Sequence, residues 1–115
     1  MVSFLLHSRT QVHIFHWQTK SYAEHKALGS YYEDIVDLLD GLVESYQGKY
    51  GILEGYKNLP LVNYTDSAQV IEFFEKLAGI ITILRQENQD SYLQNQIDTI
   101  IELIETTKYK LRFLS

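Results

Sequence analysis

The sequence predicts an all-α fold: one four-helix bundle with a long crossover between the second and third helices. Three observations predict it. Apolar residues recur at steps of three and four along most of the 115 residues. The single proline, Pro60, stands in the one long stretch without helical periodicity, residues 51–64. No stretch shows the alternation of a strand. A chain of this length suits a single domain, 1–115, with a substantial core.

The first two helices are expected over about residues 2–22 and 23–50. Each has an apolar seam that alternates steps of three and four, as a helix packed on one face requires. Seams of this kind favour nearly parallel packing of neighbouring helices, at about 20°. The first seam is Leu5, Ser8, Val12, Phe15, Thr19, Tyr22, and the second is Leu28, Tyr32, Ile35, Leu39, Leu42, Tyr46.

The last two helices are expected over about residues 66–86 and 90–113. Thr65 or Asp66 can cap the third, and Asp66 has capping-box spacing to Gln69. The fourth begins near Asp90 or Ser91. Their seams are Val70, Phe73, Leu77, Ile81, Leu84, and Leu93, Ile97, Ile100, Ile104, Thr107, Leu111, Leu114.

The connection over residues 51–64 is long enough to run along the whole bundle. A helix of 22 residues is roughly 33 Å long, and fourteen extended residues reach about 45 Å. A four-helix bundle with one long crossover has the ferritin-like topology. An up-down-up-down bundle also accommodates a long loop, so the length permits the crossover without requiring it.

Composition excludes several classes of function. The net charge is −5 and the ten Lys and Arg form no block, which argues against DNA binding. The absence of cysteine excludes disulfides and thiolate metal sites. No apolar run is long enough for a membrane span, and the first residues lack the features of a secretory signal. We therefore expect a cytoplasmic protein without a membrane partner.

Two stripes border the seams of the first two helices. One carries histidines and cations, and the other carries carboxylates. If the two stripes are ordinary polar borders of the apolar seams, the acids are solvated and the histidines are half-buried. If the two stripes face each other, their imidazole and carboxylate groups form a site suited to iron, manganese or zinc. The stripes are Leu6, Arg9, His13, His16, Lys20 and Glu33, Asp37, Asp40, Glu44, Gln47.

A di-iron site inside one subunit would need two Glu-x-x-His pairs on separate helices. The residues three before the histidines are Phe4, Thr10, His13 and Tyr22, so no such pair exists. Any metal must therefore use the first two helices, with the same helices of a second chain as the source of further ligands.

The pattern His-Trp, His, Asp, Glu resembles the mini-ferritins, the Dps-type family named after DNA-binding protein from starved cells. His16 and Trp17 match its first element and His25 its second; Asp40 follows fifteen residues later and Glu44 four beyond that. Asp37 also matches an acidic position of the family. The likeness covers about residues 10–48. The chain also resembles small uncharacterised proteins of tailed bacterial viruses that share "HWQT" and "HKALG".

The mini-ferritin resemblance implies a ferroxidase centre across a two-fold dimer interface. His16 and His25 of one chain would face Asp40 and Glu44 of its partner, with His13 and Asp37 as secondary candidates. The cargo would be iron, with zinc or manganese as alternatives, and the assembly a homo-oligomer, at least a dimer and in the family a dodecamer. Two departures are plain: the interval between His16 and His25 is shorter than usual, and Gly29 stands where the family often has an acid.

Two other classes of function stay open at this point. The first is a non-catalytic oligomeric bundle, viral in origin, that keeps the ferritin-like fold without metal chemistry. The second is a dimer stabilised by zinc without redox chemistry. Trp17 is expected to anchor the bundle or the dimer in either case.

Overall fold

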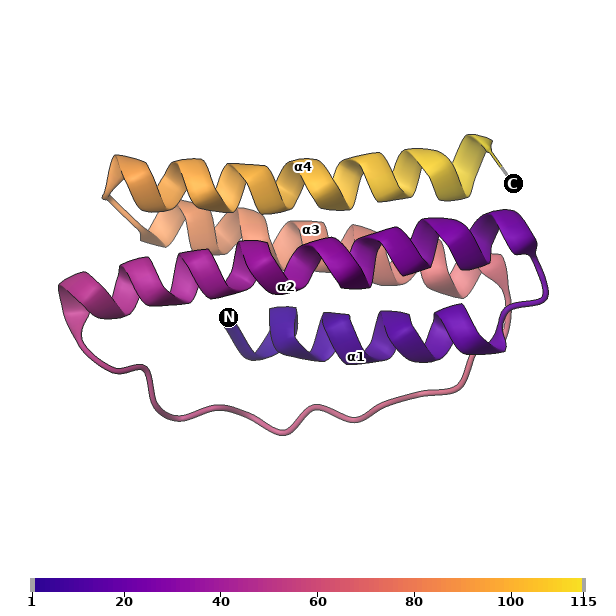
Figure 1. The fold of residues 1–115 in the computed structure, drawn as a ribbon, viewed down its shortest axis with the longest axis horizontal. Helices are drawn as coiled ribbons and strands as arrows, with labels where there is room; N and C mark the ends of the chain where they lie inside the picture. The colour runs from indigo at the N-terminus through magenta and orange to yellow at the C-terminus, as the bar shows by residue number, and fades with distance from the viewer. Residues whose placement is uncertain (1, 115) are drawn as a thin grey trace.

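A computed structural model describes residues 2–114, and these residues form four helices and no strand (Figure 1). The all-helical prediction is therefore confirmed. The helices are α1 (Val2–Gln18), α2 (Tyr22–Tyr50), α3 (Ser67–Glu87) and α4 (Ser91–Phe113). No helix in this described part is long and apolar enough to cross a lipid bilayer.

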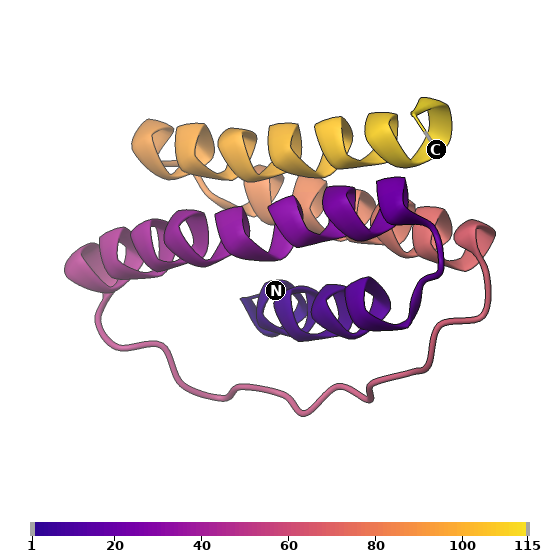
Figure 2. The same ribbon diagram turned by 45° about the vertical axis from the view of Figure 1, so that its right-hand side comes forward.

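The helices pack side by side in the order α1, α2, α4, α3, and α1 also touches α3. Figures 1 and 2 show that each helix runs opposite to the neighbours it packs against, while α2 and α3, which lie on a diagonal, run the same way. This is so because the chain between α2 and α3 returns along the outside of the bundle before α3 begins. Antiparallel neighbours place opposite ends of their helix dipoles together, which is favourable.

The core is built from the predicted seams, with local shifts. Leu5, Leu28 and Ile81 are fully buried, and so is most of the α4 seam through Leu111. In α2 the fully buried tyrosine is Tyr31, whereas the predicted Tyr32 is half-buried; in α3 the buried aromatic is Phe74, whereas Phe73 is half-buried. Two seam residues were wrong: Tyr22 is 73% exposed and Leu114 is 53% exposed, because each stands at a helix end beyond the packed turns.

The predicted boundary between the first two helices was wrong. α1 ends at Gln18 and α2 begins at Tyr22, so residues 19–21 form a short connection. Ser21 is the N-cap of α2, and its hydroxyl accepts a hydrogen bond from the Glu24 backbone N–H at 3.2 Å. A serine followed three residues later by glutamate has capping-box spacing, which marks this boundary in the sequence.

The predicted starts of the last two helices agree with the structure. Asp66 caps α3 and accepts from the Gln69 N–H at 2.8 Å. Asp90 caps α4 without a side-chain bond to that helix. Instead its carboxylate accepts hydrogen bonds from Lys49 and Tyr50, which ties the end of α2 to the α3–α4 turn. The hydrogen bond from Lys49, followed by that from Tyr50, lowers the pKa of Asp90.

The connection between α2 and α3 is extended and is fastened to α1 by a polar stripe on that helix. Gln11, fully buried, both donates to the Val62 carbonyl and accepts from the Val62 N–H, each at 2.8 Å. Three further hydrogen bonds join the two segments: the Lys57 N–H to Ser3 Oγ, His7 Nε2 to the Pro60 carbonyl, and the Tyr64 N–H to Gln18 Oε1. These contacts follow the same order along α1 and along the connection, which fixes the path of the connection.

Candidate metal centre

His16 and His25 bind each other's backbone across the α1–α2 joint. His16 Nδ1 lies 2.5 Å from the His25 carbonyl oxygen, and His25 Nδ1 lies 2.7 Å from the His16 carbonyl oxygen. The rings stack with centroids 3.6 Å apart and planes 18° apart. A carbonyl oxygen only accepts, so both Nδ1 atoms carry the hydrogen. Within residues 2–114 neither Nε2 has a hydrogen-bond partner, so the Nε2 atom of each ring is open to a ligand when it carries no hydrogen.

Gly29 makes room for this pair. A Cβ atom added at Gly29 would lie 3.0 Å from His16 Cε1 and 3.2 Å from His16 Nδ1. The His16 ring therefore rests directly on the backbone of α2. The glycine that departs from the mini-ferritin pattern has a physical reason here, because a side chain at this position would meet the ring.

His13 lies one turn before His16 and is packed among aromatic rings. Its ring stacks on Tyr32 at 3.9 Å between centroids, and the Trp17 ring lies 4.1 Å away on a tilted plane. Burial lowers the pKa of His13, and the charges of His16 and then Arg9 lower it further. Its neutral form is thus favoured, which suits both a packed interface histidine and a metal ligand.

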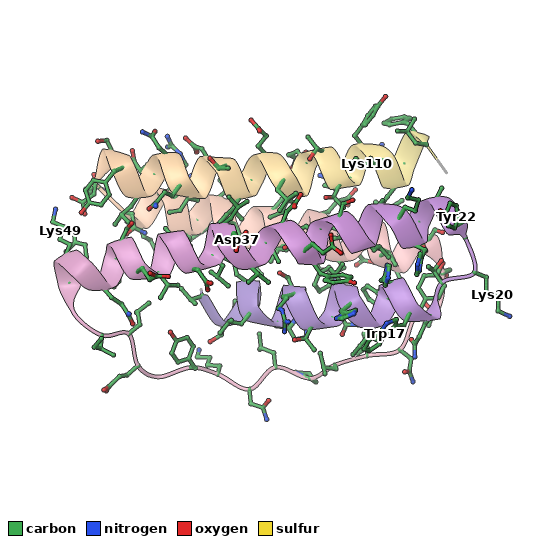
Figure 3. The ribbon with its side chains drawn as sticks, viewed as in Figure 1. Trp17, Lys20, Tyr22, Asp37, Lys49 and Lys110 are labelled. Atoms are coloured by element: carbon green, nitrogen blue, oxygen red, sulfur yellow. The ribbon has the colours of Figure 1, made fainter. Side chains whose placement is uncertain are left out.

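The carboxylates lie farther along α2 on its exposed surface. Asp37, Asp40 and Glu44 are all exposed, and Figure 3 shows Asp37 midway along the helix. Asp40 stands about 16 Å along the helix axis from Gly29, the residue under His16. Among the described residues no three His, Asp or Glu side chains are grouped as a metal site would require. A site that joins His16 and His25 to Asp40 and Glu44 therefore requires a second chain.

Glu24 is the one buried carboxylate among residues 2–114. The sequence pattern did not single it out as a candidate site residue. It is 5% exposed, and its Oε1 atom has no hydrogen-bond partner among residues 2–114. It precedes His25 in the first turn of α2, where its backbone N–H bonds to the Ser21 cap. The signal that points to it is the spacing from Ser21, which places an acid three residues after the cap.

The chain was compared with known protein families. The model of a family of unknown function, DUF5856, matches residues 16–111. The chain belongs to this family. The DUF5856 match begins at His16, so all four residues proposed as ligands lie inside it. No curated protein and no solved structure matches the chain.

Proposed function

We propose that this DUF5856 protein is a ferritin-like bundle that binds Fe(II) between two subunits and oxidises it. His16 and His25 of one chain would bind the iron together with Asp40 and Glu44 of its partner. The observation that carries the proposal is the state of the two histidines. Each Nδ1 is held by a backbone carbonyl while each Nε2 is left without a partner in the described chain. Histidines that ligate metals are commonly oriented in this way.

The path of the chain supports the ferritin-like part of the proposal. α2 and α3 run the same way on a diagonal, and the connection between them passes along the bundle (Figure 1). A bundle with one long crossover of this kind is the ferritin-like topology. In this topology facing helices project ligands for iron, and here the histidine stripe and the acidic stripe come from the adjacent helices α1 and α2.

The acidic stripe supports the intersubunit part. Asp37, Asp40 and Glu44 are exposed, and within residues 2–114 none of them forms an ion pair or a side-chain hydrogen bond. Unpaired carboxylates on one face are available to a cation held by another chain. Neutral imidazole with carboxylate suits Fe(II). When Fe(II) loses one electron to dioxygen or peroxide, the anionic oxygens favour the more highly charged product.

Ferric absorbance after aerobic addition of Fe(II) tests the chemistry. We expect the native protein to oxidise Fe(II) faster than buffer, and His16→Ala and Asp40→Asn each to bring the rate to that of buffer. His7→Gln is the matched control, because a glutamine amide can still donate to the Pro60 carbonyl. Asp40 is exposed, so Asp40→Asn tests the site without disturbing the core.

Mixing the two inactive variants tests the location between subunits. A dimer of one His16→Ala chain and one Asp40→Asn chain has one site with all four ligands and one site that lacks two. After free exchange of subunits in a two-fold dimer, about a quarter of all sites are intact, so about a quarter of the native rate returns. Failure to recover any rate, with exchange verified by native mass spectrometry, would contradict an intersubunit site.

A non-catalytic bundle is the second candidate, and one observation favours it. The two histidines bond to each other's carbonyls and fill the space over Gly29, so the pair already fastens α1 to α2 without a metal. In that case Fe(II) is oxidised no faster than in buffer, while His16→Ala lowers the thermal midpoint. Metal analysis of protein purified without added iron distinguishes a third candidate, a zinc-stabilised dimer, from the iron-oxidising and the non-catalytic bundle, because only that dimer should contain zinc.

A further inference from the structure

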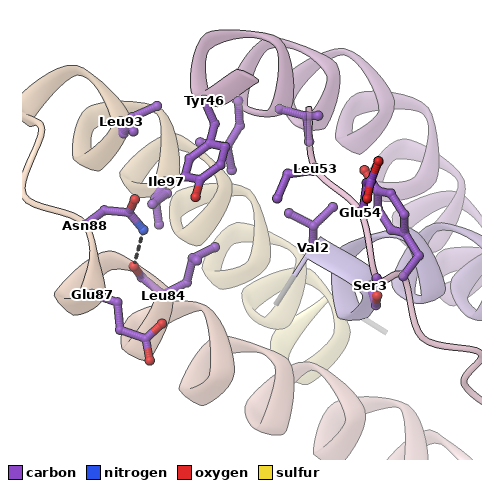
Figure 4. Close-up of a pocket in the computed structure, with 14 residues that line it drawn as sticks. Val2, Ser3, Tyr46, Leu53, Glu54, Leu84, Glu87, Asn88, Leu93 and Ile97 are labelled. Atoms are coloured by element: carbon purple, nitrogen blue, oxygen red, sulfur yellow. Dashed lines mark hydrogen bonds between the residues drawn. The ribbon is translucent and has the colours of Figure 1, made fainter. Parts of the chain in front are cut away.

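A pocket of about 290 Å³ lies between the ends of α2 and α3 and the start of α4 (Figure 4). In Figure 1 this is the end of the bundle away from the α1–α2 joint, where the histidine pair lies. At this end α2, α3 and α4 extend past the first described turn of α1. Val2 and Ser3 of α1 and residues 53–56 of the connection complete the wall. Because three helices and an extended segment meet here in place of four helices, the side chains leave space between them.

The larger part of the pocket lining is apolar. Leu42 and Val43 from α2, Leu84 from α3 and Leu93 and Ile97 from α4 form its floor and sides. An engineered apolar cavity of about 150 Å³ is large enough to bind benzene. Natural ligand pockets begin at about 300 Å³. The pocket therefore has the size for a single small apolar molecule.

The charged side chains among the described residues that line the pocket are both acidic. Glu54 of the connection and Glu87 near the end of α3 lie on opposite sides of it (Figure 4), and among residues 2–114 no Lys, Arg or His lines it. Neither glutamate forms an ion pair with another described residue. Asn88 donates from Nδ2 to the Leu84 carbonyl at 2.8 Å, which leaves its Oδ1 atom as an acceptor. The Tyr46 hydroxyl has no hydrogen-bond partner among residues 2–114.

We propose that this pocket binds a small amphipathic amine: an apolar chain or ring that carries one ammonium group. The apolar part lies against the leucine and isoleucine side chains, where burial stabilises it. The ammonium lies at the mouth, where the negative charges of Glu54 and Glu87 on either side attract it. A carboxylate ligand of the same size would be repelled by both glutamates, because like charges at close range are unfavourable.

Titration of the ¹⁵N-labelled full chain with hexylammonium, hexanol, hexanoate and methylammonium tests the proposal. We expect hexylammonium to shift the amide signals of Val43, Gly55 and Ile97 in a saturable way. Hexanol should bind about three- to tenfold more weakly, since partly exposed ion pairs contribute modestly. Hexanoate and methylammonium should not saturate. Equal affinity for hexanol and hexylammonium, or no saturable shift with hexylammonium, would overturn the proposal.

Variants locate the two halves of the site. Glu54→Gln and Glu87→Gln should each weaken hexylammonium binding about two- to fivefold and leave hexanol unchanged. Glu75→Gln, an exposed change elsewhere on α3, is the matched control. Val43→Phe should fill the pocket and abolish binding of both probes, with its fold checked by circular dichroism. If both glutamate variants bind hexylammonium as the Glu75→Gln variant does, the proposal is wrong even where Val43→Phe fails to fold.

Discussion

At the scale of single residues, the core contains one polar pair whose direction of donation is fixed by its neighbours. Ser8 Oγ donates to the Leu5 carbonyl at 2.7 Å, so its hydrogen is used there. The Tyr31 hydroxyl, 2.8 Å from Ser8 Oγ, must therefore be the donor in that contact. Both residues are fully buried, and burial raises the pKa of Tyr31. The pair links α1 to α2 inside the core.

Donation from Tyr31 to Ser8 predicts that removal of the two hydroxyls lowers the free energy of unfolding by unequal amounts. Ser8→Ala leaves the buried Tyr31 hydroxyl without an acceptor and should lower the free energy of unfolding by about 1–3 kcal/mol. Tyr31→Phe leaves Ser8 bonded to Leu5 and should cost less, about 0.5–1.5 kcal/mol. Urea unfolding measures both values. A larger loss for Tyr31→Phe than for Ser8→Ala would show that the assigned direction of donation is wrong.

Gly29 and Gly79 form a matched pair of helical glycines in different surroundings. Gly79 has no atom within 4 Å of an added Cβ, so Gly79→Ala should raise the free energy of unfolding by up to about 1 kcal/mol through helix propensity. Gly29→Ala should lose this gain and destabilise the chain, because its Cβ would lie 3.0 Å from the His16 ring. Thermal unfolding compares the two variants, and an equal stabilisation by both would contradict the packing of His16 on α2.

The sequence placed His25 near the α1–α2 joint and His16 on the first helix but could not reveal what they bond to. Spacing along one helix indicates which residues share its face. The reciprocal bonds depend on two backbone carbonyls that only the turn at residues 19–21 brings close to the rings. The role of Gly29 was hidden for the same reason, since a glycine has no side chain whose pattern could signal a contact.

At the scale of elements, the helices were predicted closely where the apolar pattern is regular. α3 and α4 begin and end within a residue or so of the predicted limits. The boundary between α1 and α2 was missed because the apolar period continues through it to Tyr22, although the Ser21 cap interrupts the helix. A period describes which faces are apolar, whereas caps determine where a helix stops.

The extended connection depends on the polar stripe of α1, and Gln11 is its central member. Gln11→Ala removes both bonds to Val62 and should lower the free energy of unfolding by about 1–2 kcal/mol. Hydrogen exchange should also become faster at the Val62 and Tyr64 N–H groups, which Gln11 and Gln18 hold in the native chain. Gln86→Ala, an exposed change on α3, serves as the control. Unchanged exchange at Val62 would show that the connection does not depend on this contact.

At the scale of the whole molecule, the exposed aromatic residues at the α1–α2 joint are an unusual surface for an isolated chain. Trp17 is 68% exposed and Tyr22 is 73% exposed, and Figure 3 shows both near the end where these helices meet. Trp17 follows His16 directly, so an interface that completed the proposed iron site would lie beside it.

Assembly through this face predicts that the only tryptophan becomes buried. Its fluorescence emission should lie at shorter wavelength than that of a solvent-exposed tryptophan, and native mass spectrometry should give an even number of subunits. Trp17→Glu should shift the mass to the monomer without loss of helix, since the side chain is exposed in one chain. Tyr92→Glu, in the first turn of α4 at the other end of the bundle (Figure 1), is the control, because Tyr92 is 45% exposed. A monomeric native protein would contradict the assembly and the intersubunit site together.

The sequence by itself determined the helical class, the approximate extent of four helices and the faces that form the core. It could do so because apolar periodicity and caps are local properties of the chain. Only the tertiary structure decided the reciprocal bonds of His16 and His25, the attachment of the connection to α1 and the pocket at the far end of the bundle. Each of these joins groups on different elements of the chain, and their distances depend on how the helices and their connections pack.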